Sequence, residues 1–308
     1  MYRSILVPLD GSAFGEHALP VAHAIARASG ATVHLAQVHV PSVKHYLASA
    51  PSVDAGLDAE NRKREQAYLE DIPARMGAEA DLKLVPVSLD GPVAQALATY
   101  VSTNEIDLVV MTTHGRGGFT RLWLGSVAYT LAHQITVPLL LIRPNETPPE
   151  LTARRTLRHF LIPLDGSPLA EQILEPTLEL GKLMQAECTL LHVVEPLQLI
   201  GYSPTAAAVN LEANVTDSLR QDAEQYLGTL EQRLQADGVP VHTKVVIDAQ
   251  SAAGIVRVAG ESGMDMIAMA THGRGGLSRM LLGSVADKVV RSAEIPILVY
   301  GPKDHEAQ

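Results

Sequence analysis

Short apolar runs alternate along the chain with longer segments in which apolar residues recur at helical spacing. Helical spacing is clear in 14–29, 92–103 and 223–238, and the last of these ends in glycine, a common stop signal. The apolar runs are rich in Val, Leu and Ile, and they lie at 4–10, 32–40, 82–89, 107–113 and 137–143, and again at 159–165, 188–194, 241–247, 265–271 and 295–301. Such runs are typical of parallel strands covered by helices on both faces. The pattern therefore predicts an α/β fold with two open, mostly parallel five-stranded sheets in flavodoxin-like layers.

Two motifs occur once in each half of the chain. The sequence ILVPLDGS at 5–12 returns as FLIPLDGS at 160–167. The longer sequence THGRGGFTRLWLGSVA at 113–128 returns as THGRGGLSRMLLGSVA at 271–286. Because the displacement is nearly the same for both motifs, the two halves are interpreted as two copies of one domain.

A proline-rich segment of mixed charge precedes the second copy and is the natural linker. We expect one domain at 1–146, a linker at 147–157 and a second domain at 158–303. A chain of 308 residues is long enough for two domains of ordinary size, each with its own core. The last strand of each half should lie at a sheet edge and pair with its counterpart. This predicts an intrachain pseudo-dimer, with a further homodimer as an open alternative.

Charge and cysteine content narrow the class of protein. The formal net charge is −10, so the chain has no overall basic field for a nucleic acid backbone. Cys188 is the single cysteine and can form no internal disulfide, which fits a reducing compartment. No apolar run approaches the roughly 18 residues of a membrane span, and the N-terminus lacks the features of a signal peptide. These observations predict a cytoplasmic protein whose partners include neither nucleic acid nor membrane.

The repeated glycine motif has the chemistry of a phosphate site. Gly115 and Gly118 permit a loop whose backbone N–H groups approach a ligand without interference from Cβ atoms, and Arg116 adds positive charge. Gly125 and Ser126 begin a helical segment, so we expect free N-terminal amides and a hydroxyl to face the same phosphate. On this interpretation the glycine before the helix allows the backbone to approach the ligand. The second half repeats the set as Gly273, Arg274, Gly276, Gly283 and Ser284.

Two other features of each half should meet this loop. Asp10 and Asp165 directly follow the first strand of their half, and Val38 and Val193 lie near the end of the second strand. In open parallel sheets a ligand sits at the carboxyl ends of the strands, where the strand order reverses. The topology therefore predicts one crevice per half that contains the acid, the valine and the glycine loop.

The loop matches neither of the common phosphate fingerprints. A Walker A loop requires a lysine after its second glycine, and none follows these glycines. A dinucleotide fingerprint requires glycine where Thr120 and Ser278 stand, and it would follow the first strand instead of the fourth. His114 and His272 have no second ligand at metal-binding spacing, so we expect hydrogen-bonded loop histidines and no metal site built by the protein.

With these motifs the chain resembles a tandem member of the universal stress protein family, over both halves and nearly the whole length. Nucleotide-binding members of that family carry Gly-x2-Gly-x9-Gly-[Ser/Thr], and the segments 115–126 and 273–284 keep the nine-residue spacing. The leading glycine is absent, since Thr112 and Ala270 stand at its position. In the family this residue lies along the ribose, and a small residue is acceptable there if the backbone makes the contact.

The resemblance implies an adenine nucleotide site in each half, on a fold like that of adenine nucleotide α-hydrolases. The aspartates match the acid that contacts the adenosine part, and the valines match the position whose backbone reads the adenine edge. The methionines of the fourth strands match residues that line sugar and base, and the loop residues match the phosphate cradle. The first-half set is Pro8, Asp10, Val38, Met111, Thr112, Gly115, Arg116, Gly118, Gly125, Ser126 and Val127. The second-half set is Pro163, Asp165, Val193, Met269, Ala270, Gly273, Arg274, Gly276, Gly283, Ser284 and Val285.

The implied ligand is ATP or another adenine nucleotide, accompanied by Mg²⁺. Three functions are possible: a nucleotide-responsive stress-resistance module with one site per domain, a slow ATPase or ATP-dependent enzyme on a related fold, and a nucleotide-free stress interaction protein. Ser126 has no evident base partner, and Asp10 and Asp165 are isolated acids, so no catalytic constellation is visible. The glycines are intact in both halves, which argues against loss of the site. The sequence therefore favours the regulatory module, with at most slow hydrolysis.

Several of these residues also have purely structural interpretations. Asp10 could do no more than cap a turn that begins a helix, and Met111 and Met269 could be ordinary core residues. Arg121 and Arg279 fit solvated surface charges as well as phosphate contacts. The sequence leaves these alternatives open.

Overall fold

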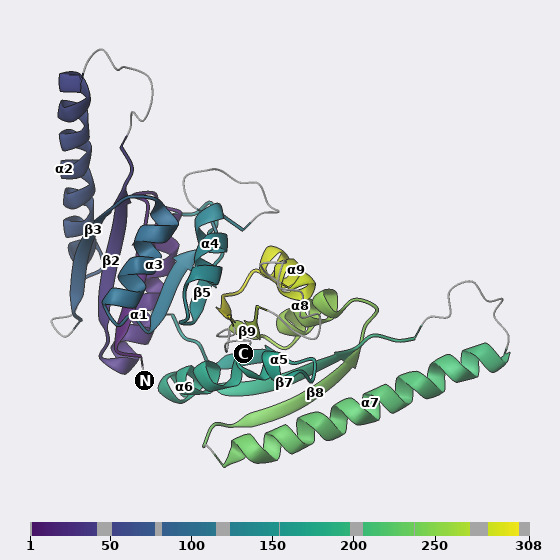
Figure 1. Ribbon diagram of the computed structural model, residues 1–308. Helices are drawn as coiled ribbons and strands as arrows, with labels where there is room; N and C mark the ends of the chain where they lie inside the picture. Colours follow the sequence, from purple (N-terminus) through teal and green to yellow (C-terminus); the bar gives the residue numbers. More distant parts are fainter. Residues whose placement is uncertain are drawn as a thin grey trace, which may run out of the picture. The chain divides into compact units, whose positions relative to one another are not determined.

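The chain forms two compact units, Met1–Thr156 and Leu157–Gln308, in the computed structural model. The structure describes residues 2–41, 51–77, 82–114, 124–153, 155–197, 206–236, 238–271 and 283–301, with the backbone alone at 51–55 and 206–208. Strands and helices alternate along each unit (Figure 1). Each of the ten apolar runs forms a strand, so the strand prediction is confirmed throughout the described part of the chain.

The first unit is the α/β half that begins at the N-terminus. Its strands are β1 (Ser4–Leu9), β2 (Thr32–His39), β3 (Leu84–Asp90), β4 (Leu108–Thr112) and β5 (Leu139–Ile142). Its helices are the short 3₁₀ helix η1 (Gly15–Ala18), α1 (Leu19–Ser29), α2 (Pro51–Arg75), α3 (Val93–Thr103) and α4 (Ser126–Gln134).

The second unit repeats this order of elements. Its strands are β6 (His159–Pro163), β7 (Glu187–Val194), β8 (Val241–Ile247), β9 (Met266–Ala270) and β10 (Ile297–Tyr300). Its helices are α5 (Pro168–Glu171), α6 (Leu174–Met184), α7 (Ala206–Gln235), α8 (Ser251–Glu261) and α9 (Ser284–Ser292).

Within each unit the strand order reverses at the first strand. The first unit runs β3-β2-β1-β4-β5, and the second runs β8-β7-β6-β9-β10. The described strand pairs of both units are parallel. The fold prediction is confirmed, and the reversal places the carboxyl ends of β1 and β4, and of β6 and β9, beside the crevice where ligands bind in such sheets.

The central strands form the core of each unit, whereas the outer strands β3 and β8 are only partly covered. Leu6 in β1 and Phe160 in β6 are fully buried. By contrast, Val85 in β3 is 38% exposed and Ile247 in β8 is 46% exposed. These two strands are partly exposed because a strand at the outer edge of its unit's sheet lies at the margin of the helical layers.

The helix α7 begins earlier than the helical spacing at 223–238 indicates, and α2 forms in a part of the chain outside the three segments with clear helical spacing. The segments 41–56 and 195–210 have loop composition, yet α2 begins at Pro51 and α7 begins at Ala206. In Figure 1 the N-terminal part of α7 extends beyond the ends of the strands of its own unit. A helical turn that faces no sheet needs no apolar stripe, which explains why helical spacing is missing there.

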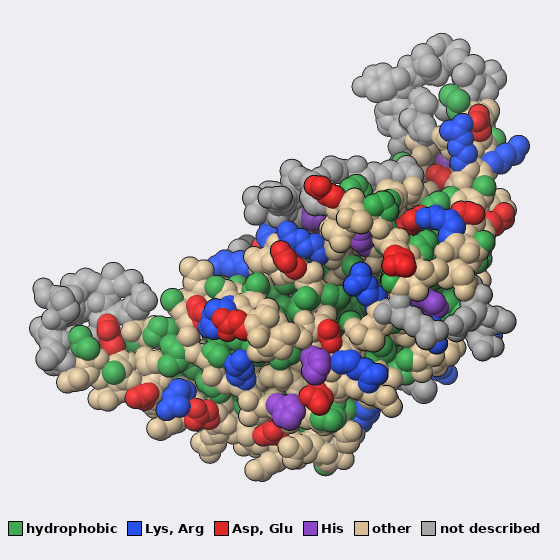
Figure 2. Space-filling view, turned by 180° about the vertical axis from the view of Figure 1, so that it is seen from behind, with side chains coloured by type: hydrophobic (Ala, Val, Ile, Leu, Met, Phe, Trp, Pro, Cys, Tyr) green, Lys and Arg blue, Asp and Glu red, His purple; other side chains and the backbone are tan. Residues whose placement is uncertain are grey.

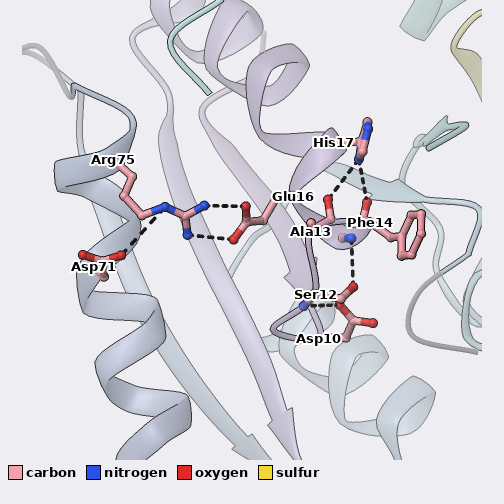
Figure 3. A network of polar contacts seen from close by, with 9 residues as sticks. Asp10, Ser12, Ala13, Phe14, Glu16, His17, Asp71 and Arg75 are labelled. Atoms are coloured by element: carbon pink, nitrogen blue, oxygen red, sulfur yellow. Dashed lines mark hydrogen bonds and ion pairs between the residues drawn. The ribbon is translucent and has the colours of Figure 1, made fainter. Parts of the chain in front are cut away.

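A polar network ties the long helix of each unit to the helix that follows the first strand. Glu16 accepts two hydrogen bonds from the Arg75 guanidinium, at 2.8 and 2.6 Å (Figure 3). In the second unit Glu171 accepts from Arg233 at 2.9 Å and from the Tyr226 hydroxyl at 3.0 Å. The glutamate and arginine recur at matching positions, which aligns α2 with α7 residue by residue.

The described surface is mixed in charge. On the face drawn in Figure 2, basic and acidic side chains are interspersed among apolar and uncharged ones. In the part of the chain that the structure describes, no helix is both long enough and apolar enough to span a lipid bilayer.

Candidate functional site

The acid at the end of the first strand organises a tight turn in both units. Asp10 Oδ1 accepts hydrogen bonds from the Ser12 backbone N–H at 3.0 Å and from the Ser12 hydroxyl at 2.6 Å (Figure 3). Asp165 Oδ1 accepts from the Ser167 backbone N–H at 2.9 Å, and the Ser167 hydroxyl in turn caps α5. The turn interpretation is therefore correct, and a contact with a nucleotide stays a prediction for both aspartates.

The helices α4 and α9 both begin at a glycine. Gly125 and Gly283 are the N-cap residues, and a glycine has no side chain with which to cap its own helix; among the described residues, no side-chain hydrogen bond is made at either cap. The Gly125 N–H donates to the Thr113 carbonyl at 2.7 Å, and the Gly283 N–H donates to the Thr271 carbonyl at 2.6 Å. These bonds fix each helix start beside the end of the fourth strand, where first-turn amides can donate hydrogen bonds to an anion.

A cavity of about 830 Å³ lies at this edge of the second unit. Its volume is within the range of roughly 300–1,000 Å³ that is usual for sites that bind small molecules. It brings together every second-half site residue that the structure describes, namely Pro163, Asp165, Val193, Met269, Ala270, Gly283, Ser284 and Val285. The start of α9 thus lines a cavity together with the ends of β6, β7 and β9.

The corresponding first-half residues occupy matching elements. Pro8 lies in β1, Val38 in β2, Met111 and Thr112 in β4, and Gly125, Ser126 and Val127 at the start of α4. The Thr112 hydroxyl donates to the His114 carbonyl at 2.9 Å, so the threonine at the leading-glycine position is tied to its own loop. Met111 and Met269 are buried, at 7% and 6% exposed. That burial fits their core interpretation, and Met269 also lines the cavity.

Six of the predicted phosphate-loop residues lie outside the described residues. They are Gly115, Arg116, Gly118, Gly273, Arg274 and Gly276. His272, Arg121 and Arg279 lie outside them as well. Their contribution to a site stays a prediction.

His114 is hydrogen-bonded to its neighbour, as the loop interpretation expects. Its Nδ1 lies 3.1 Å from the Thr113 hydroxyl. Burial lowers the pKa of His114, and the charge of Arg143 lowers it further. Over the described ranges, no cluster of three or more His, Cys, Asp or Glu side chains is arranged to hold a metal ion.

Part of the cavity wall comes from residues that the sequence motifs did not indicate. The helices α7 and α8 and the end of β7 contribute polar and apolar side chains, including His192, Glu195, Leu219, Asp222, Ala223, Tyr226, Ser251 and Ile255. A signal existed for one of them: Tyr226 precedes Arg233 by the same interval as Tyr68 precedes Arg75. A tyrosine and an arginine repeated at this interval in both halves indicate a shared structural role.

Two polar groups of this wall have defined protonation states. Hydrogen bonds from the Ser251 hydroxyl at 2.6 Å and from its backbone N–H at 3.0 Å lower the pKa of Glu195, so its carboxylate is ionised at neutral pH. Burial raises the pKa of Tyr226, and the negative charge of Glu171 raises it further. The phenol is therefore neutral and acts as the donor to Glu171.

The glycine before α4 has a structural reason that differs from the expected one. A Cβ at Gly125 would lie 2.7 Å from the Thr113 carbonyl oxygen, closer than real Cβ atoms approach. The conformation therefore excludes a side chain even without a ligand. The end of β4 already fills the space, so this glycine is required by the fold itself, and its role in the approach to a ligand stays a prediction.

Gly125→Ala should therefore destabilise the first unit by roughly 1–3 kcal/mol, since the backbone at the start of α4 must shift. Urea unfolding followed by circular dichroism measures this change. Gly228→Ala is the matched control: a Cβ at this position in α7 meets nothing within 4 Å, and alanine favours a helix by up to about 1 kcal/mol. Equal stability of Gly125→Ala and the parent would contradict the geometry.

Comparison with known proteins follows the division into two halves. The model of the Universal stress protein family matches residues 1–143 and 156–301. The chain is 28% identical over 200 residues to universal stress protein Rv2005c of Mycobacterium tuberculosis, a match that covers 64% of this chain and 62% of the relative. It is 30% identical over 142 residues to universal stress protein MJ0531 of Methanocaldococcus jannaschii, covering 46% of this chain and 81% of the relative.

Solved structures resemble the chain over nearly its full length. A universal stress protein from Archaeoglobus fulgidus aligns with a TM-score of 0.63 at 20% identity and covers 97% of this chain and 98% of its own. At this identity the likeness shows the fold. The match to the mycobacterial relative covers less than two thirds of that protein's length.

Proposed function

Because the chain belongs to the universal stress protein family, with the family's domain in both halves, we propose that it is a nucleotide-responsive regulatory protein of the stress response. Its ligand is an adenine nucleotide, with ATP as the preferred one, and each unit holds one site. The observation that carries this proposal is the second-unit cavity, which the N-terminus of α9 lines with its glycine cap and first turn.

The two ends of the cavity suit the two ends of a nucleotide. Apolar side chains such as Val193, Ile255 and Met269 line the part formed by β7, α8 and β9 and offer a surface to a base and sugar. Ser284 and Val285 lie at the start of α9, where first-turn N–H groups and the positive end of the helix dipole favour a phosphate. In this proposal the arginine of the glycine loop supplies the remaining positive charge.

The divalent cation enters with the nucleotide. Since the described residues hold no ready-made metal cluster, Mg²⁺ would be bound mainly by the phosphate oxygens. The carboxylates of Asp165, Glu195 and Asp222 line the cavity and are the acidic side chains available to such an ion or its water shell. When bound, the cation neutralises part of the phosphate charge.

The proposed activity is binding, with at most slow hydrolysis. In the part of the chain that the structure describes, no hydrogen bond links the Ser284 hydroxyl to a general base. Turnover should therefore be far slower than the median enzyme rate of roughly 10 per second.

Isothermal titration calorimetry of the full chain tests this function. ATP with Mg²⁺ should bind saturably, and GTP should bind at least tenfold more weakly because its purine edge carries a carbonyl where adenine carries an amine. A release assay for inorganic phosphate should show turnover well below one per second. Absence of heat with 1 mM ATP, or equal affinity for GTP, would overturn the proposal.

A further inference from the structure

The two sites can be compared residue by residue, because strand register aligns them. Pro8 of β1 is paired with Ala36 of β2, and Pro163 of β6 is paired with Leu191 of β7. Counting three residues onward from each paired position leads to His39 in the first unit and Val194 in the second. A histidine thus stands where the second unit has a valine of the cavity wall.

The long helices are aligned by the glutamate–arginine contact described above. Tyr68 precedes Arg75 by seven residues in α2, and Tyr226 precedes Arg233 by seven residues in α7. Three residues before each tyrosine stands Glu65 in α2, but Ala223 in α7. At this position the first unit has a carboxylate where the second unit has a methyl group. The carboxylate belongs to the same site as the histidine that stands in place of the valine.

In the second unit both positions are apolar, buried and part of the cavity. Val194 is 3% exposed and Ala223 is 4% exposed, and both line the cavity. A wall of this kind suits a planar base, because it places apolar atoms and no charged group beside the base, so no charge has to lose its partner or its water.

In the first unit the same positions belong to an ion cluster formed by His39, Asp58, Glu65, Arg62 and Asp90. His39 Nδ1 lies 2.8 Å from Glu65 Oε2, and His39 Nε2 lies 2.7 Å from Asp58 Oδ1. The Arg62 guanidinium bridges two aspartates: its Nε lies 3.1 Å from Asp58 Oδ2, and its Nη1 lies 2.8 Å from Asp90 Oδ1. The cluster connects the end of β2, the helix α2 and the end of β3.

The contacts of His39 require both ring nitrogens to carry a proton. A neutral imidazole has a single N–H, so it could satisfy only one of the two carboxylates. Burial by itself lowers the pKa of His39, but the hydrogen bonds to Asp58 and Glu65 outweigh it and raise the pKa above its ordinary value. A base that displaced Glu65 would leave a buried cation short of a partner, which is costly.

From this difference we infer that the two nucleotide sites are not equivalent: the second unit holds the high-affinity adenine nucleotide site, and the ion cluster of the first unit weakens binding there. The inference rests on the proposed function, since it ranks the two sites that the proposal contains. Arg64 stands where the second unit has Asp222, but it is paired with Glu60 on its own helix and is largely exposed. Its charge therefore does not compensate for Glu65.

Exchanging the residues between the units tests the inference in the full chain. Calorimetry with ATP and Mg²⁺ should resolve one tight and one weak site in the parent, at least tenfold apart in affinity. Ala223→Glu should weaken the tight site by tenfold or more. The double variant His39→Val with Glu65→Ala should raise the ATP affinity of the weak site toward that of the tight site. Asp58 loses its histidine partner in this variant but keeps its ion pair with Arg62.

The control variant Gln225→Glu adds the same charge on an exposed position of α7 outside the cavity lining and should leave both affinities unchanged. Thermal melting of each variant establishes that it is folded. Two equal sites in the parent, or an unchanged tight site in folded Ala223→Glu, would overturn the inference while leaving the proposed function intact. Absence of ATP binding at both sites would instead refute the proposed function.

Discussion

Ser284→Asp should lower the affinity of the second unit for ATP by at least two orders of magnitude and leave its affinity for adenosine nearly unchanged. A carboxylate at the first position of α9 would lie where the phosphates are proposed to bind. Two like charges about 4 Å apart near a protein surface repel by about 4 kcal/mol, and each 1.4 kcal/mol corresponds to roughly tenfold in affinity. The helix itself should tolerate the change, because an acid at its N-terminus is favourable by about 0.3–1 kcal/mol.

Calorimetry with ATP and with adenosine measures the two affinities. Ser284→Asn is the matched control, since it has nearly the same shape as the aspartate without its charge, and it should cost less than tenfold. Ser126→Asp makes the corresponding change in α4 and should act on the first-unit site alone. If Ser284→Asp weakened ATP and adenosine equally, the phosphates would not lie at the start of α9.

Phe160→Ala should destabilise the second unit by about 3–5 kcal/mol, the range for removing a large buried side chain. Phe160 lies in β6 and is fully buried. Its ring lies near Gly181 of α6, where a Cβ would be 3.8 Å from Phe160 Cε2 and 3.4 Å from Cys188 Sγ. Truncation would therefore leave a void between β6 and α6 that neighbouring backbone cannot fill.

The thiol of Cys188 provides a local readout for this prediction. Cys188 is fully buried, and burial raises the pKa of its thiol to about 12, so it should react with a disulfide reagent only after the second unit opens. Phe160→Ala should shift the onset of labelling to a lower urea concentration. Phe160→Ile introduces the residue that Ile5 provides at the matching first-unit position and should cause a smaller shift. An unchanged onset in Phe160→Ala would contradict the assigned core.

The strands were predictable because burial determines them directly. Each central strand is covered on both faces, so it reads as a continuous apolar run regardless of its neighbours. The starts of α2 and α7 were not predictable in this way. The helix α2 begins at Pro51, and its first residues, PSVDAGLD, do not show a continuous apolar stripe at helical spacing. Helix propensity predicts a helix only weakly in a segment that lacks an apolar stripe.

The candidate site was predictable where topology alone decides it. Asp165, Val193 and Ser284 are far apart in sequence, yet parallel strands with this order bring their carboxyl ends to one edge, and all three line the cavity. The ion cluster was not predictable. His39 meets Asp58 and Glu65 only because α2 packs across the end of β2, and neither residue belongs to a recognisable motif.

The same limit applies to the glycine before α4. Sequence chemistry indicates a backbone that approaches a phosphate, but the distance to the Thr113 carbonyl explains why no side chain fits there. A contact between the backbone atoms of a strand end and a helix start does not depend on side-chain type, so the sequence does not indicate it. Substituting this glycine would therefore change stability and ligand affinity together, whereas substituting Ser284 should change affinity alone.

A crystal structure of the chain with a non-hydrolysable ATP analogue and Mg²⁺ would show directly where the nucleotide binds. We expect the analogue in the second-unit cavity, with its base against Val193, Val194 and Ala223 and its phosphates within hydrogen-bond distance of the backbone N–H groups of Ser284 and Val285. An analogue bound elsewhere, or an empty cavity in crystals grown at saturating analogue, would contradict this expectation.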